Sequence, residues 1–241
     1  MAAFQERLMN TTRKKRWLIP TIVVLLVIVG SGGTWYWFNQ DKALYPKDVM
    51  DRARELHDRI LSFDSHITVP MDFHTEETEA NRDGPYQFDL VKAASGRLSG
   101  GALTIFGWPE IWSGANAPHR PTPGMKEQAR HQQEVRYKII TNIVRDHPNQ
   151  AGIAYTPDDF RRLASEGKFA IFISMVNAYP LNNDLTELDR WSARGMRMFA
   201  LSYVGNNSWA DSSRPMPFFN DMPDQFNGLS DLGKQAINRL N

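Results

Sequence analysis

The sequence contains no cysteine, so the chain has no disulfide framework, no thiolate ligands for a metal and no lipoprotein anchor cysteine. An excess of one charge is also absent, because 28 basic side chains face 27 acidic ones and the formal net charge is +1. Such a balance argues against nucleic acid as a partner. The sequence also lacks a phosphate-binding glycine loop and a Ser-His-Asp arrangement. A catalytic site in this chain would therefore have to be of a kind other than a thiolate, a phosphate-binding loop or a Ser-His-Asp triad.

Charge is distributed unevenly at the N-terminus. Residues 1–16 carry five basic side chains and one acidic one, and the 22 residues from Trp17 to Phe38 carry none. As a helix, this uncharged stretch would reach roughly 33 Å, enough to cross the core of a bilayer. Basic residues before a span stay in the cytoplasm, so we expect the C-terminal domain to be periplasmic or extracellular. The aromatic side chains expected at the membrane interfaces are Trp17, Trp35, Tyr36 and Trp37.

A cleaved signal peptide is the alternative interpretation of residues 17–38. The small residues at 29–33 resemble a cleavage site. The apolar core of a signal peptide is usually only about 7–15 residues long, however, and the aromatic cluster that follows is typical of an anchor. We therefore predict an uncleaved single-pass membrane anchor. The remaining parts are then a cytoplasmic basic tail (1–16), a linker (39–47) and a globular domain (48–241).

Strand and helix signals alternate in the globular domain. The apolar, β-branched run from Phe169 predicts a buried strand, and a helix that begins near Asp184 ends at Gly195. A second strand follows, so residues 168–213 predict a strand–helix–strand unit of a parallel α/β sheet. In all we expect strands near residues 61–66, 102–106, 169–174 and 196–203. The expected helices cover residues 48–61, 126–146, 157–166, 185–194 and 231–240.

Several stretches share motifs with one known family. Lys168–Ser213 contains the strand–helix–strand unit and ends in WADSS, Ile60–Pro70 has the sequence ILSFDSHITVP, and Asn227–Asn241 has NGLSDLGKQAINRLN. In content and order they resemble the renal or membrane dipeptidases, which are zinc peptidases built on a (β/α)8 barrel. A complete barrel has eight strands. The resemblance and the strand count together predict a partial (half) TIM-type β/α barrel of about four parallel strands, preceded by one transmembrane helix.

The resemblance fails at the positions that bind metal. Where the family has His-x-Asp this chain has His66-Ile67-Thr68, and Val176 replaces the bridging glutamate. Tyr203 replaces a histidine that contacts substrate. The family's other zinc-binding histidines belong to later strands, which we expect to lie beyond Asn241. Two zinc ions roughly 3.5–4 Å apart need negative charge between them, and valine and threonine supply none. We therefore expect no zinc and no other cofactor, and we assign no catalytic residue.

Two further candidates for chemistry have simpler interpretations. Asp64 could act as a general base or could anchor a loop, and His66 is expected to be a hydrogen-bonded relic at a strand end. Residues 71–85 combine acids with a histidine, and because they lack ligand spacing on a defined element we expect a solvated surface loop. The polar residues of that loop are Asp72, His74, Glu76, Glu77 and Glu79.

Three functions remain open from the sequence. The first is a catalytically degenerate, dipeptidase-like domain that acts as a structural or accessory subunit of a larger membrane complex. The second is a zinc-dependent dipeptidase completed by another chain, and the third is a decaying gene fragment. The lost ligands and the retained scaffold favour the first. Its expected partners are the lipid bilayer and other membrane protein subunits.

Overall fold

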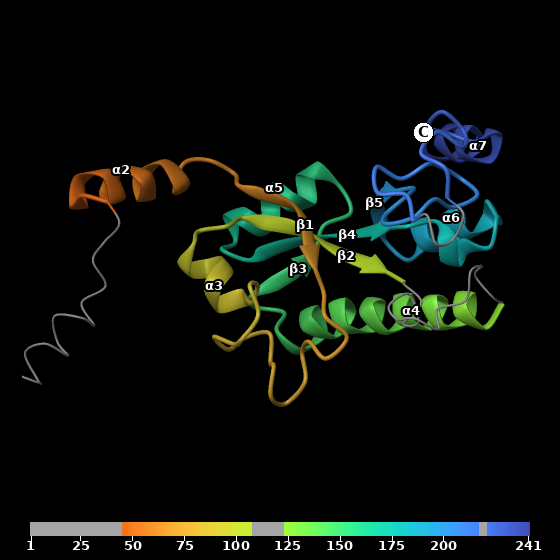
Figure 1. Cartoon of the computed structure of the whole chain (residues 1–241). Coiled ribbons are helices and arrows are strands. Elements are labelled where there is room, and N and C mark those ends of the chain that lie inside the picture. The colour runs from red at the N-terminus through yellow and green to blue at the C-terminus, as the bar shows by residue number, and fades with distance from the viewer. Residues whose placement is uncertain (1–44, 108–122, 217–220) are drawn as a thin grey trace, which may run out of the picture. The chain divides into compact units, whose positions relative to one another are not determined.

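Figure 1 shows a computed structural model of the chain, which describes residues 45–107, 123–216 and 221–241. The chain divides into two compact units, residues 1–53 and residues 54–241. The described part begins with helix α2 (Lys47–His57), none of whose residues is buried. The helix was predicted to continue to Leu61 but ends at His57. Within the described residues no helix is long and apolar enough to cross a membrane, and the predicted span 17–38 lies outside them.

The second unit is built on a parallel sheet of five strands. These are β1 (Phe63–Thr68), β2 (Gly100–Phe106), β3 (Ala151–Ile153), β4 (Phe169–Val176) and β5 (Met196–Ala200). The order along the sheet is β1-β2-β4-β3, and β5 also pairs with β4. β3 pairs with the first residues of β4 and β5 with its last ones, so both lie on the side of β4 that faces away from β2. All four pairings are parallel, as part of a β/α barrel requires.

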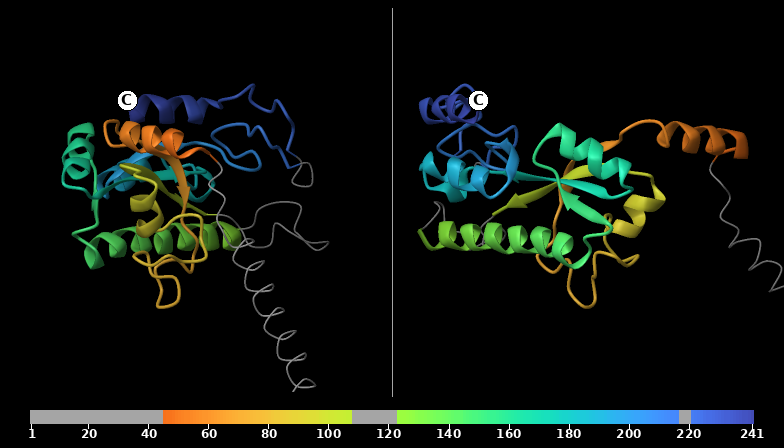
Figure 2. Two further views of the ribbon diagram at one scale, coloured as in Figure 1. Left: turned by 90° about the vertical axis from the view of Figure 1, so that its left-hand side faces the viewer. Right: turned by 180° about the vertical axis from the view of Figure 1, so that it is seen from behind.

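Helices cover both faces of this sheet (Figure 2). The long helix α4 (Pro123–Asp146) lies along one face, and α5 (Pro157–Ser165) lies on the other. The larger core joins Ile140 and Ile143 of α4 to Leu103, Ile171 and Ile173 of the sheet, all 1% exposed or less. The smaller core packs α5 against β4. The other elements are α3 (Leu90–Ser95), the short 3-10 helix η2 (Tyr179–Leu181), α6 (Thr186–Ala193) and α7 (Asp231–Leu240).

Local capping signals explain where several helices begin. The Thr156 hydroxyl accepts a hydrogen bond from the backbone N–H of Asp159, whose carboxylate in turn accepts from the backbone of Thr156. This reciprocal capping box and Pro157 fix the start of α5, as predicted. The Ser230 hydroxyl accepts from the backbone N–H of Gly233 and fixes the start of α7.

The predicted strand count was slightly wrong. All four predicted strands are present, but the three-residue β3 makes a fifth, and it is too short to give a periodic signal. β1 begins at Phe63 and extends to Thr68, and β5 ends at Ala200, before the predicted end at Tyr203. Helix α3 was not predicted, although Asp89 caps its N-terminus by accepting from the backbone N–H of Lys92 at 2.7 Å.

Candidate functional site

A polar row crosses three adjacent strands, each member two residues before the end of its strand. The ring atom Nδ1 of His66 on β1 lies 3.3 Å from the Thr104 hydroxyl on β2, which lies 2.8 Å from the Ser174 hydroxyl on β4. The other ring nitrogen of His66, Nε2, lies 3.4 Å from the Thr68 hydroxyl. Thr104 and Ser174 are buried, at 1% and 5% exposure. This end of a parallel sheet is where α/β folds place their ligands.

The structure brings only some of the predicted site residues together. His66 and Thr68 are neighbours in the polar row. Val176, 7% exposed, is paired in register with Phe106, whereas Thr68 is paired with Thr104, two residues earlier on β2. Tyr203 is 43% exposed, and its ring centre lies 6.2 Å from that of Phe106. Tyr203 lies on the loop after β5, and there its ring packs near that of Phe106.

Asp64 has a backbone role. Its Oδ1 accepts a hydrogen bond from the main-chain N–H of His66 at 2.9 Å, where the pairing of β1 with β2 is interrupted between Asp64 and Ile67. The carboxylate thereby satisfies an amide in the irregular part of the strand. Of the two interpretations left open by the sequence, a local anchor is the one that this contact supports.

Thr104 and Ser174 were missed as site residues. The sequence does contain a signal for them, because each is a hydroxyl residue within a strand that is otherwise almost wholly apolar. Both point to the same face of the sheet as His66, since the Thr104 hydroxyl contacts the His66 ring and the Ser174 hydroxyl contacts that of Thr104. Side chains alternate along a strand, so the two residues could be predicted to be neighbours only if the pairing of β2 with β4 were known.

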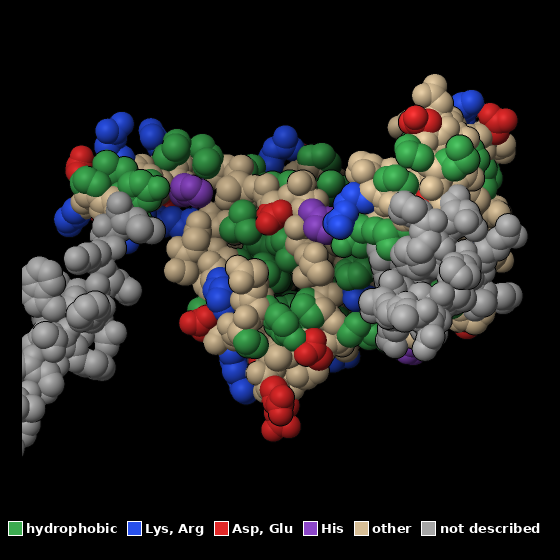
Figure 3. All heavy atoms as spheres, in the orientation of Figure 1, with side chains coloured by type: hydrophobic (Ala, Val, Ile, Leu, Met, Phe, Trp, Pro, Cys, Tyr) green, Lys and Arg blue, Asp and Glu red, His purple; other side chains and the backbone are tan. Residues whose placement is uncertain are grey.

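A hollow of about 640 Å³ lies beside β1. Its lining includes Asp64, His66 and Thr68 of the strand and the aromatic residues Phe73 and Tyr86. In the space-filling view, apolar side chains are visible in the hollowed middle of the face that carries β1 and α3 (Figure 3). The imidazole of His66 therefore borders a partly apolar recess of the size that small ligands occupy.

The donors around His66 do not suit the zinc pair of the resembled family. Both ring nitrogens of His66 face neutral hydroxyl groups, those of Thr104 and Thr68. Hydroxyls are poor zinc ligands and bring no negative charge, and Val176 cannot ligate a metal at all. The described residues at these strand ends do not fit a two-zinc centre.

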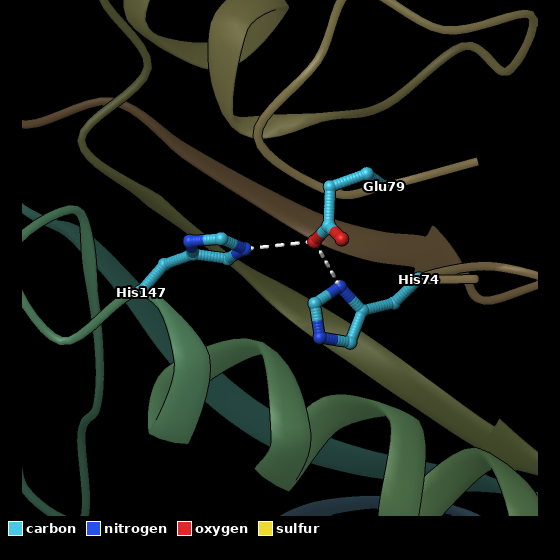
Figure 4. Close-up of side chains that lie close together, drawn as sticks. All are labelled: His74, Glu79 and His147. Carbon is cyan, nitrogen blue, oxygen red and sulfur yellow. Dashed lines mark hydrogen bonds and ion pairs between the residues drawn. The ribbon is translucent and has the colours of Figure 1, made fainter. Parts of the chain in front are cut away.

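A second cluster of polar side chains lies away from the strand ends (Figure 4). Glu79 Oε1 lies 2.8 Å from Nδ1 of His74 and 2.8 Å from Nε2 of His147. The hydrogen bond with His147 is the main reason that the pKa of Glu79 is below its ordinary value, although burial opposes it. His74 Nε2 lies 3.0 Å from Oδ2 of Asp146.

This cluster corrects the prediction of a solvated loop over residues 71–85. Asp72, Glu76 and Glu77 are exposed as expected. The side chain of His74, in contrast, is only 5% exposed and that of Glu79 only 25%. His147 was not predicted at all, because it follows α4 some seventy residues later and only the fold brings it to the loop. A single sequence contains no signal for such a long-range convergence.

The comparisons with known proteins agree with this fold. The probable dipeptidase PvdM from Pseudomonas aeruginosa, a crystal structure, is 68% identical over 81% of this chain and 48% of its own, with a TM-score of 0.76. The dipeptidase AC, a metallopeptidase of family M19, is 18% identical over 76% of this chain and 54% of its own, with a TM-score of 0.59.

A metallopeptidase from Rhodobacter sphaeroides, solved with a phosphinate mimic of L-Ala-D-Ala, is 19% identical over 75% of this chain and 56% of its own, with a TM-score of 0.58. The last two resemblances concern the fold alone. The chain spans about half the length of these proteins. No curated protein sequence matches it. The family described as membrane dipeptidase, peptidase family M19, matches residues 50–241, and the chain therefore belongs to that family.

Proposed function

We propose that the dipeptidase-like domain is catalytically degenerate and acts as a membrane-anchored structural or accessory subunit of a larger membrane complex. The observation that carries this proposal is the surroundings of His66, whose two ring nitrogens both face hydroxyl groups. A histidine held in this way lacks the anionic neighbours with which metallopeptidase sites bind zinc and activate water.

The strand ends lack the negative charge that two-metal chemistry needs. Peptide hydrolysis by two metals needs a bridging anion, and the site replaces the expected carboxylates with Thr68 and Val176. Thr104 and Ser174 extend the neutral row across the sheet. The strand ends keep the scaffold of the family but have lost the electrostatics of its chemistry, which favours a binding or structural role.

The proposed location rests on residues outside the described part of the chain. The uncharged stretch 17–38 follows a basic tail, which supports a single-pass anchor with a cytoplasmic N-terminus. The domain then lies in the periplasm or outside the cell. Confinement to the membrane raises the effective concentration of a partner in the same bilayer, so that a modest interface would be sufficient for assembly.

One experiment separates this function from its main alternative. The full chain would be purified from its native membranes in mild detergent, and its assembly size and its hydrolysis of a dipeptide would be measured with and without added zinc. We expect a stable assembly larger than the chain in its micelle and no hydrolysis. Hydrolysis that disappears in the His66→Gln variant but persists in a His131→Gln control would instead establish a zinc dipeptidase completed by another chain.

A second measurement tests the anchor. Protease added to spheroplasts should digest the domain while the N-terminal tail stays protected. A mature N-terminus near Gly33 would show that the span is removed, and the proposal of a permanent anchor would then fail.

A further inference from the structure

Three potential metal ligands converge beside the C-terminal end of α4. His74 and Glu79 come from the loop between β1 and α3, and His147 comes directly after α4 (Figure 4). One ligand atom from each side chain lies within 4.8 Å of the other two. Four metal–ligand bonds of about 2.05 Å in a tetrahedron separate neighbouring ligand atoms by roughly 3.3 Å. The cluster therefore needs only small side-chain movements to surround one ion.

His74 supplies an independent indication of a missing cation. Its side chain is 5% exposed, and its buried Nδ1 has no hydrogen-bond partner although Glu79 Oε1 is only 2.8 Å away. Its other nitrogen, Nε2, lies 3.0 Å from Asp146 Oδ2 and is therefore the atom that donates a proton. With the proton on Nε2, Nδ1 carries a lone pair that no donor meets, and Glu79 Oε1 lies 2.8 Å from it without the alignment of a hydrogen bond. Two acceptors this close repel each other, and either a second ring proton or a metal ion supplies the positive charge that the contact needs.

Asp146 orients His74 in the manner of a metal site. Histidines that bind metals usually donate their second ring proton to a carboxylate, which fixes the tautomer and makes the ligating nitrogen more basic. Asp146 is itself held by Arg145, whose Nε lies 2.7 Å from Asp146 Oδ1. These contacts hold the Asp146 carboxylate in place beside His74.

We propose that His74, Glu79 and His147 bind a single zinc ion that ties the loop between β1 and α3 to the end of α4. Two imidazoles and one carboxylate are a donor set that zinc commonly takes, with water in the fourth position. The side chains of Glu79 and His147 are 25% and 14% exposed, so the ion can enter from solvent. None of the three is a position that the family motifs assign to metal. This proposal does not depend on the proposed function.

The test uses the full chain in detergent after removal of metals by a chelator and dialysis. Zinc would be titrated in, and Co²⁺ would be added separately as a spectroscopic probe of coordination. We expect about one equivalent of zinc to remain after a second dialysis, visible absorption from tetrahedral cobalt, and a higher thermal midpoint with zinc.

Variants assign the binding to these residues. His147→Gln and Glu79→Gln should each weaken zinc binding at least tenfold and abolish the rise in the thermal midpoint. Asp146→Asn, which keeps all three ligands, should weaken binding by about 10–100-fold. His131→Gln is the matched control, because His131 lies exposed on α4, the helix that His147 follows, and His66→Gln controls for binding at the strand ends.

Several results would overturn the proposed zinc site. No retained zinc in the wild-type chain would overturn the proposal, as would unchanged binding in both Glu79→Gln and His147→Gln. Zinc that is lost in His66→Gln but kept in these two variants would assign the metal to the strand ends and also overturn it. If His147→Gln fails to give the circular dichroism of the folded chain, the nearly isosteric Glu79→Gln decides the question.

Discussion

Arg136 donates a hydrogen bond from Nε to the main-chain carbonyl oxygen of Val69 at 2.9 Å. Its Nη1 donates to the carbonyl oxygen of Phe106 at 3.0 Å, and the guanidinium lies 3.6 Å from the centre of the Phe106 ring. One side chain of α4 thus binds the chain at the ends of both β1 and β2. Burial lowers the pKa of Arg136 to about 10, but the group still carries its charge at neutral pH.

We predict that Arg136→Met destabilises the domain by about 2–4 kcal/mol. The substitution leaves the buried carbonyls of Val69 and Phe106 without their donor and removes a stacked side chain. Arg136→Lys should recover only part of the loss, because an ammonium cannot reach two carbonyls with a planar fork. Denaturant unfolding of the full chain measures the effect, with the exposed Arg161→Met as control, which should change stability by less than about 0.5 kcal/mol. Equal effects at both positions would refute the role of Arg136.

The close approach of β2 to α4 gives a second prediction. A Cβ atom at Gly107 would lie 1.9 Å from the carbonyl oxygen of Ala129, which is main chain and cannot turn aside. Gly107→Ala should therefore force the helix away from the strand end and cost at least about 2 kcal/mol. The control is Gly84→Ala, whose Cβ would have its nearest neighbour at 3.8 Å. Comparable thermal midpoints for the two variants would show that this end of the sheet adapts freely.

Acid should weaken the contact between the loop and α4. In the folded chain the pKa of Glu79 is below its ordinary value of 4.5, chiefly because of the hydrogen bond with His147. A carboxylate of this kind stabilises the fold above pH 4.5, and the stabilisation is lost as the pH falls through the lowered folded value. In the presence of chelator, the thermal midpoint of the wild-type chain should fall more steeply between pH 6 and 3 than that of Glu79→Gln.

The exposed Glu76 provides the control for this pH dependence. Glu76→Gln should reproduce the acid slope of the wild-type chain. A wild-type slope in Glu79→Gln would mean that the cluster contributes nothing to stability at neutral pH.

The open edge of β1 predicts how the domain behaves without the rest of its assembly. Within the described residues β1 pairs only with β2, and near this edge Ile60, Leu61 and Phe63 are 43%, 53% and 40% exposed. Unpaired strand edges with apolar neighbours favour association. Residues 48–241 expressed alone should therefore be oligomeric or aggregated in size-exclusion chromatography. A monodisperse monomer would remove the structural reason for a partner.

A positive charge introduced near the open edge of β1 tests whether that edge causes the association. Leu61→Lys should shift the population towards monomer, because a lysine at a strand edge opposes edge-to-edge pairing. Met222→Lys is the control, since Met222 is 66% exposed and lies far from β1 in the sequence. The same shift in both variants would indicate a general effect of charge on solubility.

Much of the fold could be predicted because its signals are local. Thr156, Pro157 and Asp159 specify the start of α5 within a few residues, and the apolar run from Phe169 specifies β4. β3 was missed because three residues stabilised mainly by pairing with β4 leave no pattern of their own. The partial barrel was inferred through the family resemblance, since strand order cannot be derived from periodicity.

Some residues of the candidate sites could be predicted from local sequence, and others could not. His66 and Thr68 could be named because a motif surrounds them, and Asp64 proved to bond its neighbouring backbone. Thr104 and Ser174 become site residues only through the register of β2 and β4. The contact of Glu79 with His147 joins positions 68 residues apart, and it depends on where α4 ends relative to the loop. Such contacts follow from packing, which the local sequence does not encode.

The pairing of β2 with β4 also has a consequence for synthesis of the chain. Gly100 on β2 is paired with Ala170 on β4, seventy residues later. At about 5–20 residues per second, a ribosome needs roughly 4–14 s to make the intervening chain. Throughout that time β1 and β2 can form at most a two-stranded ribbon, which is marginal on its own. Until β4 emerges, β2 therefore has an unpaired edge that is open to wrong strand pairing.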